Sequence, residues 1–361
     1  MVKRIFNFSP GPAALPLPVL EKAQEDLLNF QNTGMSVMEM SHRSKEIEEM
    51  ISETERLTNE LLNLGDNFRV LFLQGGATTQ FSMVPLNFLP EGRTADYIIT
   101  GSFAEKAYKD AVKVGNIHVA GSSEDTDHNR IMSLDEINLS SSPEYVHITS
   151  NNTIYGTQWQ TLPNFGDIPL VADMSSDIMS YPFDVSNFGL IYAGAQKNLG
   201  PAGVTVAIVR KDMFDKVPDH LPSMQRYDLL AEKNSLLNTP PCFNIYIVNL
   251  VLQWIKDNGG LEAINKHNKE KASYVYQAID NSDGFYLGHA QKESRSLMNV
   301  TFRLQTEELE KKFIKEAKEE GLVGLKGHRS VGGIRASIYN AMTKEGCMKL
   351  AEFMEDFQKK N

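Results

Sequence analysis

Short apolar runs that alternate with helical patterns are the feature that most constrains the fold of this chain. Few polar residues interrupt the runs at 70–73, 97–99, 145–148, 170–172, 190–192 and 204–209. Apolar residues at helical spacing lie between most of these runs. Because a strand that is apolar throughout must be covered on both faces, the pattern predicts an α/β fold with a mainly parallel central sheet.

The character of the chain changes after Gly259 and Gly260. The remainder mixes helical patterns at 261–279, 306–320 and 343–357 with short strand patterns near 298–302 and 334–338. We therefore predict a large α/β domain over residues 16–260. The N-terminal arm, residues 1–15, and residues 261–361 are predicted to form a smaller α+β domain, and a chain of 361 residues is long enough for both.

One lysine, Lys197, lies in a turn between two of the apolar runs. The turn Gly194-Ala195-Gln196-Lys197-Asn198-Leu199-Gly200-Pro201 is too rich in glycine to be a helix face. A lysine that is desolvated at such a place has a lowered pKa, which covalent chemistry by an amine requires. The alternative is an ordinary turn lysine.

An aspartate, Asp173, ends the apolar run Leu170-Val171-Ala172. The carboxyl ends of parallel strands form the edge of the sheet at which open α/β folds bind ligands. Taken alone, Asp173 is better explained as a cap of the next turn. Together with Lys197 it is the expected partner of the pyridine nitrogen of pyridoxal phosphate (PLP), which it would keep protonated.

Several segments indicate that anions bind to this chain. Gly75-Gly76-Ala77-Thr78 follows a strand pattern and opens a helix pattern, so its backbone N–H groups could hold a phosphate, although such a turn is common. Three basic clusters are Ser41-His42-Arg43, Gly327-His328-Arg329 and Gly332-Gly333-Ile334-Arg335. Most surface arginines are simply solvated, but the guanidinium fork suits carboxylates and phosphates.

Charge and composition exclude other classes of protein. A net charge of −10 disfavours nucleic acid as the main partner. Two cysteines, Cys242 and Cys347, make no disulfide framework, which suits a cytoplasmic protein, and the histidines show no spacing typical of a metal site. No apolar run approaches the roughly 20 residues of a membrane span, so no membrane partner is expected.

Six segments, in order, resemble the phosphoserine aminotransferase family, class V aminotransferases of the PLP-dependent fold type I. They are Ser9-Pro10-Gly11-Pro12, Met40-Ser41-His42-Arg43-Ser44, Gly75-Gly76-Ala77-Thr78, Val171-Ala172-Asp173, Gly194-Ala195-Gln196-Lys197-Asn198 and Asn238-Thr239-Pro240-Pro241. The match continues to Ser337, so it covers nearly the whole chain. It implies a homodimer whose active sites lie at the subunit interface.

The resemblance also implies a role for each matched residue. Lys197 would bind PLP covalently, Asp173 would pair with the pyridine nitrogen and Thr153 would hydrogen-bond near the ring. Phe103 would stack on the ring, where many members of the family carry tryptophan. The cofactor phosphate would be held by Gly76, Ala77, Thr78 and Gln196, with Asn238 and Thr239 from the partner subunit.

The substrates implied are L-glutamate and 3-phosphohydroxypyruvate, which would give 2-oxoglutarate and O-phospho-L-serine in L-serine biosynthesis. Arg335 would bind the α-carboxylate. His42 and Arg43, with His328 and Arg329 contributed across the dimer, would receive the phosphate or the side-chain carboxylate. Some relatives also use a phosphorylated hydroxythreonine in pyridoxine biosynthesis.

Alternative functions within the same fold stay open at this point. One is another class V aminotransferase that acts on a small anionic amino acid, and another is a non-catalytic binding protein with the PLP fold. A desulfurase would need a cysteine nucleophile in a mobile loop, and neither cysteine is placed for that role. A nucleotide-dependent oxidoreductase is disfavoured because the dinucleotide-binding fingerprint is missing.

Overall fold

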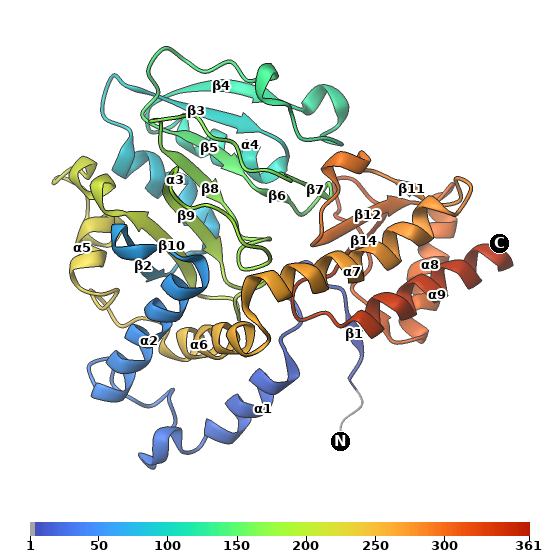
Figure 1. Cartoon of the computed structure of the whole chain (residues 1–361), viewed down its shortest axis with the longest axis horizontal. Coiled ribbons are helices and arrows are strands. Elements are labelled where there is room, and N and C mark those ends of the chain that lie inside the picture. Colours follow the sequence, from blue (N-terminus) through green and yellow to red (C-terminus); the bar gives the residue numbers. More distant parts are fainter. Residues whose placement is uncertain (1–3) are drawn as a thin grey trace.

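A seven-stranded sheet forms the centre of the computed structural model, which describes residues 4–361 (Figure 1). Across the sheet the strands are β2 (Phe68–Leu73), β10 (Thr205–Arg210), β9 (Phe188–Gly194), β8 (Leu170–Asp173), β5 (Val146–Thr149), β3 (Thr94–Ile99) and β4 (Asn116–Ser122). All neighbours from β9 to β4 pair in parallel, whereas β10 is antiparallel to both β9 and β2. The predicted mainly parallel sheet is therefore confirmed. The short turn that carries Lys197 explains the exception, because it is too short for the crossover that a parallel pair needs.

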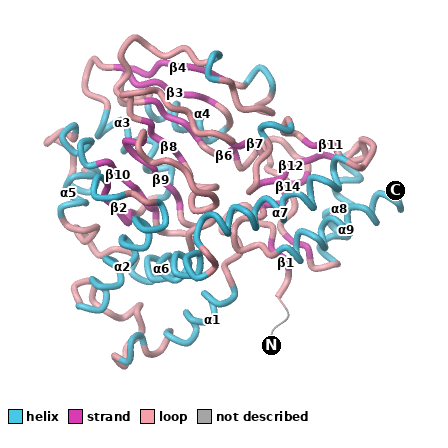
Figure 2. Tube along the Cα trace, in the orientation of Figure 1, coloured by secondary structure: helices cyan, strands magenta, loops and turns pink. Residues whose placement is uncertain are grey.

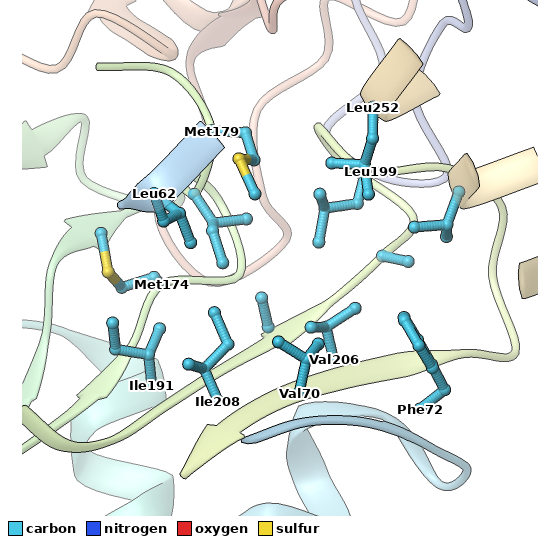
Figure 3. Packing of buried hydrophobic residues seen from close by; sticks show 14 of the residues in the cluster. Leu62, Val70, Phe72, Met174, Met179, Ile191, Leu199, Val206, Ile208 and Leu252 are labelled. Carbon is cyan, nitrogen blue, oxygen red and sulfur yellow. The ribbon is translucent and has the colours of Figure 1, made fainter. Parts of the chain in front are cut away.

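Helices cover both faces of the sheet, as the apolar strands require. One face packs against α2 (Lys45–Leu62) and α6 (Cys242–Asp257), and the other packs against α3 (Gly76–Phe88), α4 (Ser102–Ala111) and α5 (Tyr227–Glu232). Successive residues of β2 belong to the two cores in turn: Val70 and Phe72 to the first, Leu71 and Leu73 to the second. Figure 3 shows Val70 and other strand residues of the first core.

A smaller group of elements lies beside this sheet (Figures 1 and 2). It contains an antiparallel sheet of β11 (Leu287–Gly288), β12 (Asn299–Arg303) and β14 (Ile334–Ser337), with helices α8 (Glu307–Glu319) and α9 (Lys344–Lys360). The N-terminal strand β1 (Phe6–Asn7) pairs in parallel with β13 (Leu322–Val323). Phe8 then packs in the core that these elements share.

The helix α7 (Gly260–Asp280) connects the two groups of elements. Its first turns contribute Leu261 and Ile264 to the core under the large sheet, and its later turns contribute Val275 and Ile279 to the second group's core. The change of core thus falls within α7, and the division of the chain at residue 260 stays a prediction. The other elements are α1 (Leu17–Asp26), β6 (Asn151–Asn152) and β7 (Thr157–Gln158). Over residues 4–361 no helix is both long and apolar enough to cross a membrane.

Candidate active site

One pocket of about 250 Å³ lies where the carboxyl ends of β2, β3, β5, β8 and β9 meet. Open α/β sheets bind ligands at this edge because loops of different strands converge there. The pocket brings together ten of the residues predicted from the sequence: Gly76, Ala77, Thr78, Phe103, Thr153, Asp173, Gln196, Lys197, His328 and Arg335. The turn after each strand thus supplies a different part of one site.

Lys197 projects into this pocket from the turn between β9 and β10. Its Nζ donates a hydrogen bond to Thr153 Oγ1 over 3.0 Å and lies 5.4 Å from the centre of the Phe103 ring. Burial lowers the pKa of Lys197 to about 8, the nearby positive charge of Arg335 acts in the same direction, and the negative charge of Asp173 opposes them. A substantial fraction of the amine is therefore neutral near pH 8 and can act as a nucleophile.

Asp173 is the last residue of β8, and the sheet fixes its position. It pairs with Thr149 of β5 on one side and with Tyr192 of β9 on the other. Its carboxylate accepts a hydrogen bond of 2.9 Å from the Ser175 N–H. Burial raises the pKa of the Asp173 carboxyl, while the positive charge of Lys197 opposes that rise. A buried carboxylate in this position favours a cationic partner, such as a protonated ring nitrogen.

The turn of Gly75 and Gly76, which opens α3 and was predicted to hold a phosphate, is called the anion cup here. Gly75 has φ +90°, and a Cβ at this position would lie 2.1 Å from Thr79 Oγ1, so only glycine fits. Gly76 also has a positive φ, of 67°. Among residues 4–361 no side chain caps the N-terminus of α3, so the N–H groups of its first turn are available to an anion at the positive end of the helix.

Arg335 supplies a buried positive charge from β14. Its side chain is 6% exposed, and its Nε has no hydrogen-bond partner among the described residues. Burial lowers the pKa of Arg335 below its usual value. The pocket lining contains a single carboxylate, that of Asp173. Because a buried guanidinium without a partner is costly, this arrangement favours an anionic ligand that reaches Arg335.

His328 reaches the same pocket from the loop between β13 and β14. The Ser330 backbone N–H donates to His328 Nδ1 over 3.2 Å, so the neutral ring carries its proton on Nε2. Burial lowers the pKa of His328, and the positive charge of Arg335 lowers it further. The ring is therefore a neutral hydrogen-bond donor rather than a cation at neutral pH.

Five of the predicted residues do not line this pocket: His42, Arg43, Asn238, Thr239 and Arg329. The Arg43 guanidinium contacts its own neighbour His42, and Asn238 hydrogen-bonds Gln74 over 3.2 Å. His328 was predicted to act across the dimer, but in this structure it borders the pocket of its own chain. The physical reason is its loop, which leads directly into the strand that carries Arg335.

Some pocket residues were missed by sequence reasoning. Asn151 and Ser176 line the pocket and share a hydrogen bond of 2.8 Å; both follow strand ends, which was the available signal. The arm residues Pro10 and Gly11 also line it, and a Cβ on Gly11 would lie 3.3 Å from Lys197 Cγ. The Tyr339 hydroxyl donates to the Pro10 carbonyl over 2.7 Å, a contact between distant parts of the chain.

Comparison with known proteins agrees with this geometry. The model of the family "Aminotransferase class-V" matches residues 5–350. The phosphoserine aminotransferases of Herpetosiphon aurantiacus and Geobacillus kaustophilus are each 57% identical to the chain, with 99% of both chains covered. A solved phosphoserine aminotransferase from Bacillus circulans subsp. alkalophilus is 55% identical with a TM-score of 0.98, each chain being 99% covered.

A lysine and an aspartate at strand ends, an anion cup and a sheet of this topology together define an aminotransferase of class V. Within that class the similarity extends over the whole length of the relatives. The chain belongs to the phosphoserine aminotransferase family. The fold is PLP-dependent across class V, and a relative from Trichomonas vaginalis, 37% identical with a TM-score of 0.93 and 98% of this chain covered, was solved with PLP bound.

Proposed function

We propose that this chain uses PLP to transfer the amino group of L-glutamate to 3-phosphohydroxypyruvate, forming 2-oxoglutarate and O-phospho-L-serine in L-serine biosynthesis. One observation carries the proposal: a partly neutral amine, a buried carboxylate and an unpaired buried guanidinium line the same pocket. An amino acid substrate needs all three, for the amine exchange, for cofactor protonation and for its own α-carboxylate.

The residues present fit PLP. The anion cup before α3 suits its phosphate, the Asp173 carboxylate suits its ring nitrogen, and the Lys197 amine suits its aldehyde. When bound, PLP supplies an electron sink for the bonds of the substrate α-carbon. The Lys197 amine, set free by the incoming substrate, takes the proton from the α-carbon and returns it later in the cycle. Thr153 Oγ1 holds the Lys197 amine within the pocket in this structure.

Substrate recognition is assigned to the basic residues. Arg335 binds the α-carboxylate, and the Nε2–H of His328 donates to the distal phosphate or carboxylate. Phosphate and carboxylate both suit a site whose lining offers several donors and only one carboxylate, that of Asp173. A substrate with two anionic groups is therefore favoured over one with a single anionic group.

A homodimer completes the site in this proposal. His42, Arg43, Asn238 and Thr239, with Arg329, would reach the pocket of a second copy, since they lie outside their own. Exposed apolar side chains in the N-terminal part of the chain support such an interface, because Leu28 is 83% and Met38 is 59% exposed. The proposal includes a cytoplasmic location, which suits the two unpaired cysteines of the chain.

The decisive experiment joins a spectrum to an assay. The purified protein should absorb in the visible range as a covalent PLP enzyme, and borohydride should fix the cofactor to Lys197, as found by peptide mass spectrometry. Lys197→Ala should lose both the fixed cofactor and about 10⁴-fold or more of the activity. A Lys197→Ala protein that still forms a reducible linkage would remove the assignment of Lys197.

A second assay tests the substrates. Glutamate consumption is followed with 3-phosphohydroxypyruvate and with unphosphorylated hydroxypyruvate, and the phosphorylated acceptor should have the higher kcat/KM by at least tenfold, about 1.4 kcal/mol. Equal values for the two acceptors would show that the site does not recognise phosphate. In that case, loss of the fixed cofactor in Lys197→Ala would still support the assignment of Lys197, and only the specificity for the phosphorylated acceptor would be wrong.

A further inference from the structure

The loop that carries His328 is closed upon itself. The Gly327 N–H donates to the Gly333 carbonyl over 2.8 Å, which joins the two ends of the loop. Inside the loop, the His328 carbonyl accepts from the N–H groups of Val331 and Gly332, at 3.1 and 2.8 Å. These bonds give the loop its shape, but they do not fix where the whole loop lies relative to the pocket.

An ion pair behind the loop fixes its position. Glu310, in the first turn of α8, is 6% exposed, and its Oε1 accepts from Arg303 Nε over 3.0 Å. The other oxygen of Glu310 accepts from the Gly333 N–H over 3.2 Å, and Arg303 Nη1 donates to the Val331 carbonyl over 3.1 Å. The pair therefore holds the second half of the loop at two backbone groups.

Glycine at the end of the loop lets the pair approach closely. Gly332 and Gly333 both have positive φ, and a Cβ on Gly332 would lie 3.3 Å from Arg303 Nη2. A Cβ on Gly333 would lie 2.8 Å from the Phe302 carbonyl oxygen. The guanidinium of Arg303 thus lies directly against the loop backbone, which no side chain separates from it.

We propose that Arg303 and Glu310 are positioning residues that determine the preference for phosphorylated substrates by holding the His328 loop against the pocket. The inference rests on the proposed function, since it takes His328 as a donor to the distal anion. Neither Arg303 nor Glu310 lines the pocket of Lys197. Arg303 lines only a small adjoining pocket, together with His328 and other residues of the loop, so we infer that the pair acts through the loop. Release of the loop should weaken binding of the distal anion and leave Lys197 and Asp173 in place.

The test uses the PLP-loaded enzyme and the half-reaction with amino donors. Single-turnover kcat/KM is measured for O-phospho-L-serine and for L-serine, and their ratio reports recognition of the phosphate. In Arg303→Met the ratio should fall about tenfold, mainly through a higher KM for O-phospho-L-serine, because a charge-assisted contact is lost. In Arg303→Lys the ratio should fall similarly. Arg303 reaches Glu310 and Val331 from two different nitrogens, and the single ammonium of lysine lacks this fork.

Three further variants make the result decisive. Arg210→Met is the matched control, because it breaks an arginine–aspartate pair with Asp212 at the opposite edge of the large sheet. Its ratio should stay within about twofold of wild type. His328→Ala measures the loop's own contribution and should lower the ratio at least as much as Arg303→Met. Glu310→Gln, nearly the same shape, replaces the Arg303 variants if these do not fold.

The outcomes separate this inference from the proposed function. If His328→Ala lowers the ratio and the Arg303 and Glu310 variants do not, the positioning role is wrong and phosphate recognition stands. If the Arg303 variants lower it and His328→Ala does not, the pair acts by some route other than this loop, and the inference is again wrong. If no variant changes the ratio, recognition of phosphate by His328 fails together with the inference, while the Lys197 chemistry is unaffected.

Discussion

The two sides of the pocket are built in different ways. On the side of Lys197 and Asp173, every predicted residue that lines the pocket comes from a strand end or the segment that follows it, whereas Asn238 and Thr239, predicted to come from a partner subunit, do not line it. On the side that would bind the distal anion, His328 comes from a closed loop, and His42, Arg43 and Arg329 do not reach the pocket of their own chain. A sheet edge fixes chemical groups rigidly, whereas loops and a second subunit allow the choice of substrate to vary on the same scaffold.

On the side of Lys197 and Asp173, which we call the rigid side, the largest effect after that of Lys197→Ala is expected from Asp173→Asn. The amide has the same shape but cannot hold a ring nitrogen in its protonated form, so the rate of transamination should fall by about 10² to 10³. Activity and the melting temperature would be measured on the same preparation of loaded enzyme. Serine at position 175 still offers its N–H to the amide oxygen, so the fold should persist. A variant with more than a tenth of the native rate would contradict the role of Asp173.

The next largest effect is expected from pH on the reactivity of the Lys197 amine. Because burial lowers the pKa of Lys197 to about 8, from an ordinary value of 10.5, its reactive neutral form is enriched roughly 10²-fold at pH 7. In protein freed of cofactor, the rate of amine labelling at Lys197, read by mass spectrometry, should rise with pH and level off above about 8. Labelling that keeps rising beyond pH 10 would show that the amine is not desolvated.

The same pKa has a consequence for stability. The protonated amine is the form that burial disfavours, so the cofactor-free protein should gain stability from Lys197 as the pH rises from about 8 towards 10.5. Below about pH 8 the amine is charged in both the folded and the unfolded protein, and this gain is absent. Lys197→Met, which removes the titrating group, should flatten that part of the profile of unfolding free energy against pH.

Much of the rigid side could be predicted from the sequence, because its signals are local. The runs that became β2, β8 and β9 are apolar on both faces, and a functional residue lies at the strand end or within three residues after it: Gly76, Asp173 and Lys197. The strand β4 was not predicted. It lies at the edge of the sheet and is mostly exposed or half-buried, so it has no continuous apolar run. A strand that is buried on both faces can be predicted from the sequence, because it is apolar throughout.

For the side of the pocket that would bind the distal anion, the sequence predicts only the types of residue. The sequence shows that His328 and Arg335 are basic and lie near glycines, but the loop that connects them is placed by Arg303 and Glu310, which belong to other elements. The contact of Tyr339 with Pro10 spans nearly the whole chain. No local pattern encodes such pairings, since they depend on how elements far apart in the sequence pack against one another.

A heterodimer tests directly whether both subunits contribute residues to the side of the pocket that would bind the distal anion. Differently tagged Lys197→Ala and Arg43→Ala chains are expressed together, and the mixed dimer is isolated. If Arg43 serves the partner's pocket, one of the two sites has both native residues, so the mixed dimer should show about half the native rate, at least tenfold above either parent. If Arg43 serves its own pocket, the mixed dimer should be no more active than the Arg43→Ala parent, which would show that the site is not shared.

The smallest effect is expected at Phe103, where the two sides meet. Its ring lies 4.9 Å from the Nζ of the exposed Lys106 and 5.4 Å from Lys197 Nζ in the pocket. Phe103→Ala should weaken cofactor retention about fivefold, since a ring stack contributes roughly 0.5–1.5 kcal/mol, and Phe103→Trp should retain the cofactor at least as well as wild type. The measurement is the rate of PLP loss on dilution. If Phe103→Ala releases PLP no faster than wild type, the ring does not stack on the cofactor, and the rigid side holds it by Lys197, Asp173 and the anion cup alone.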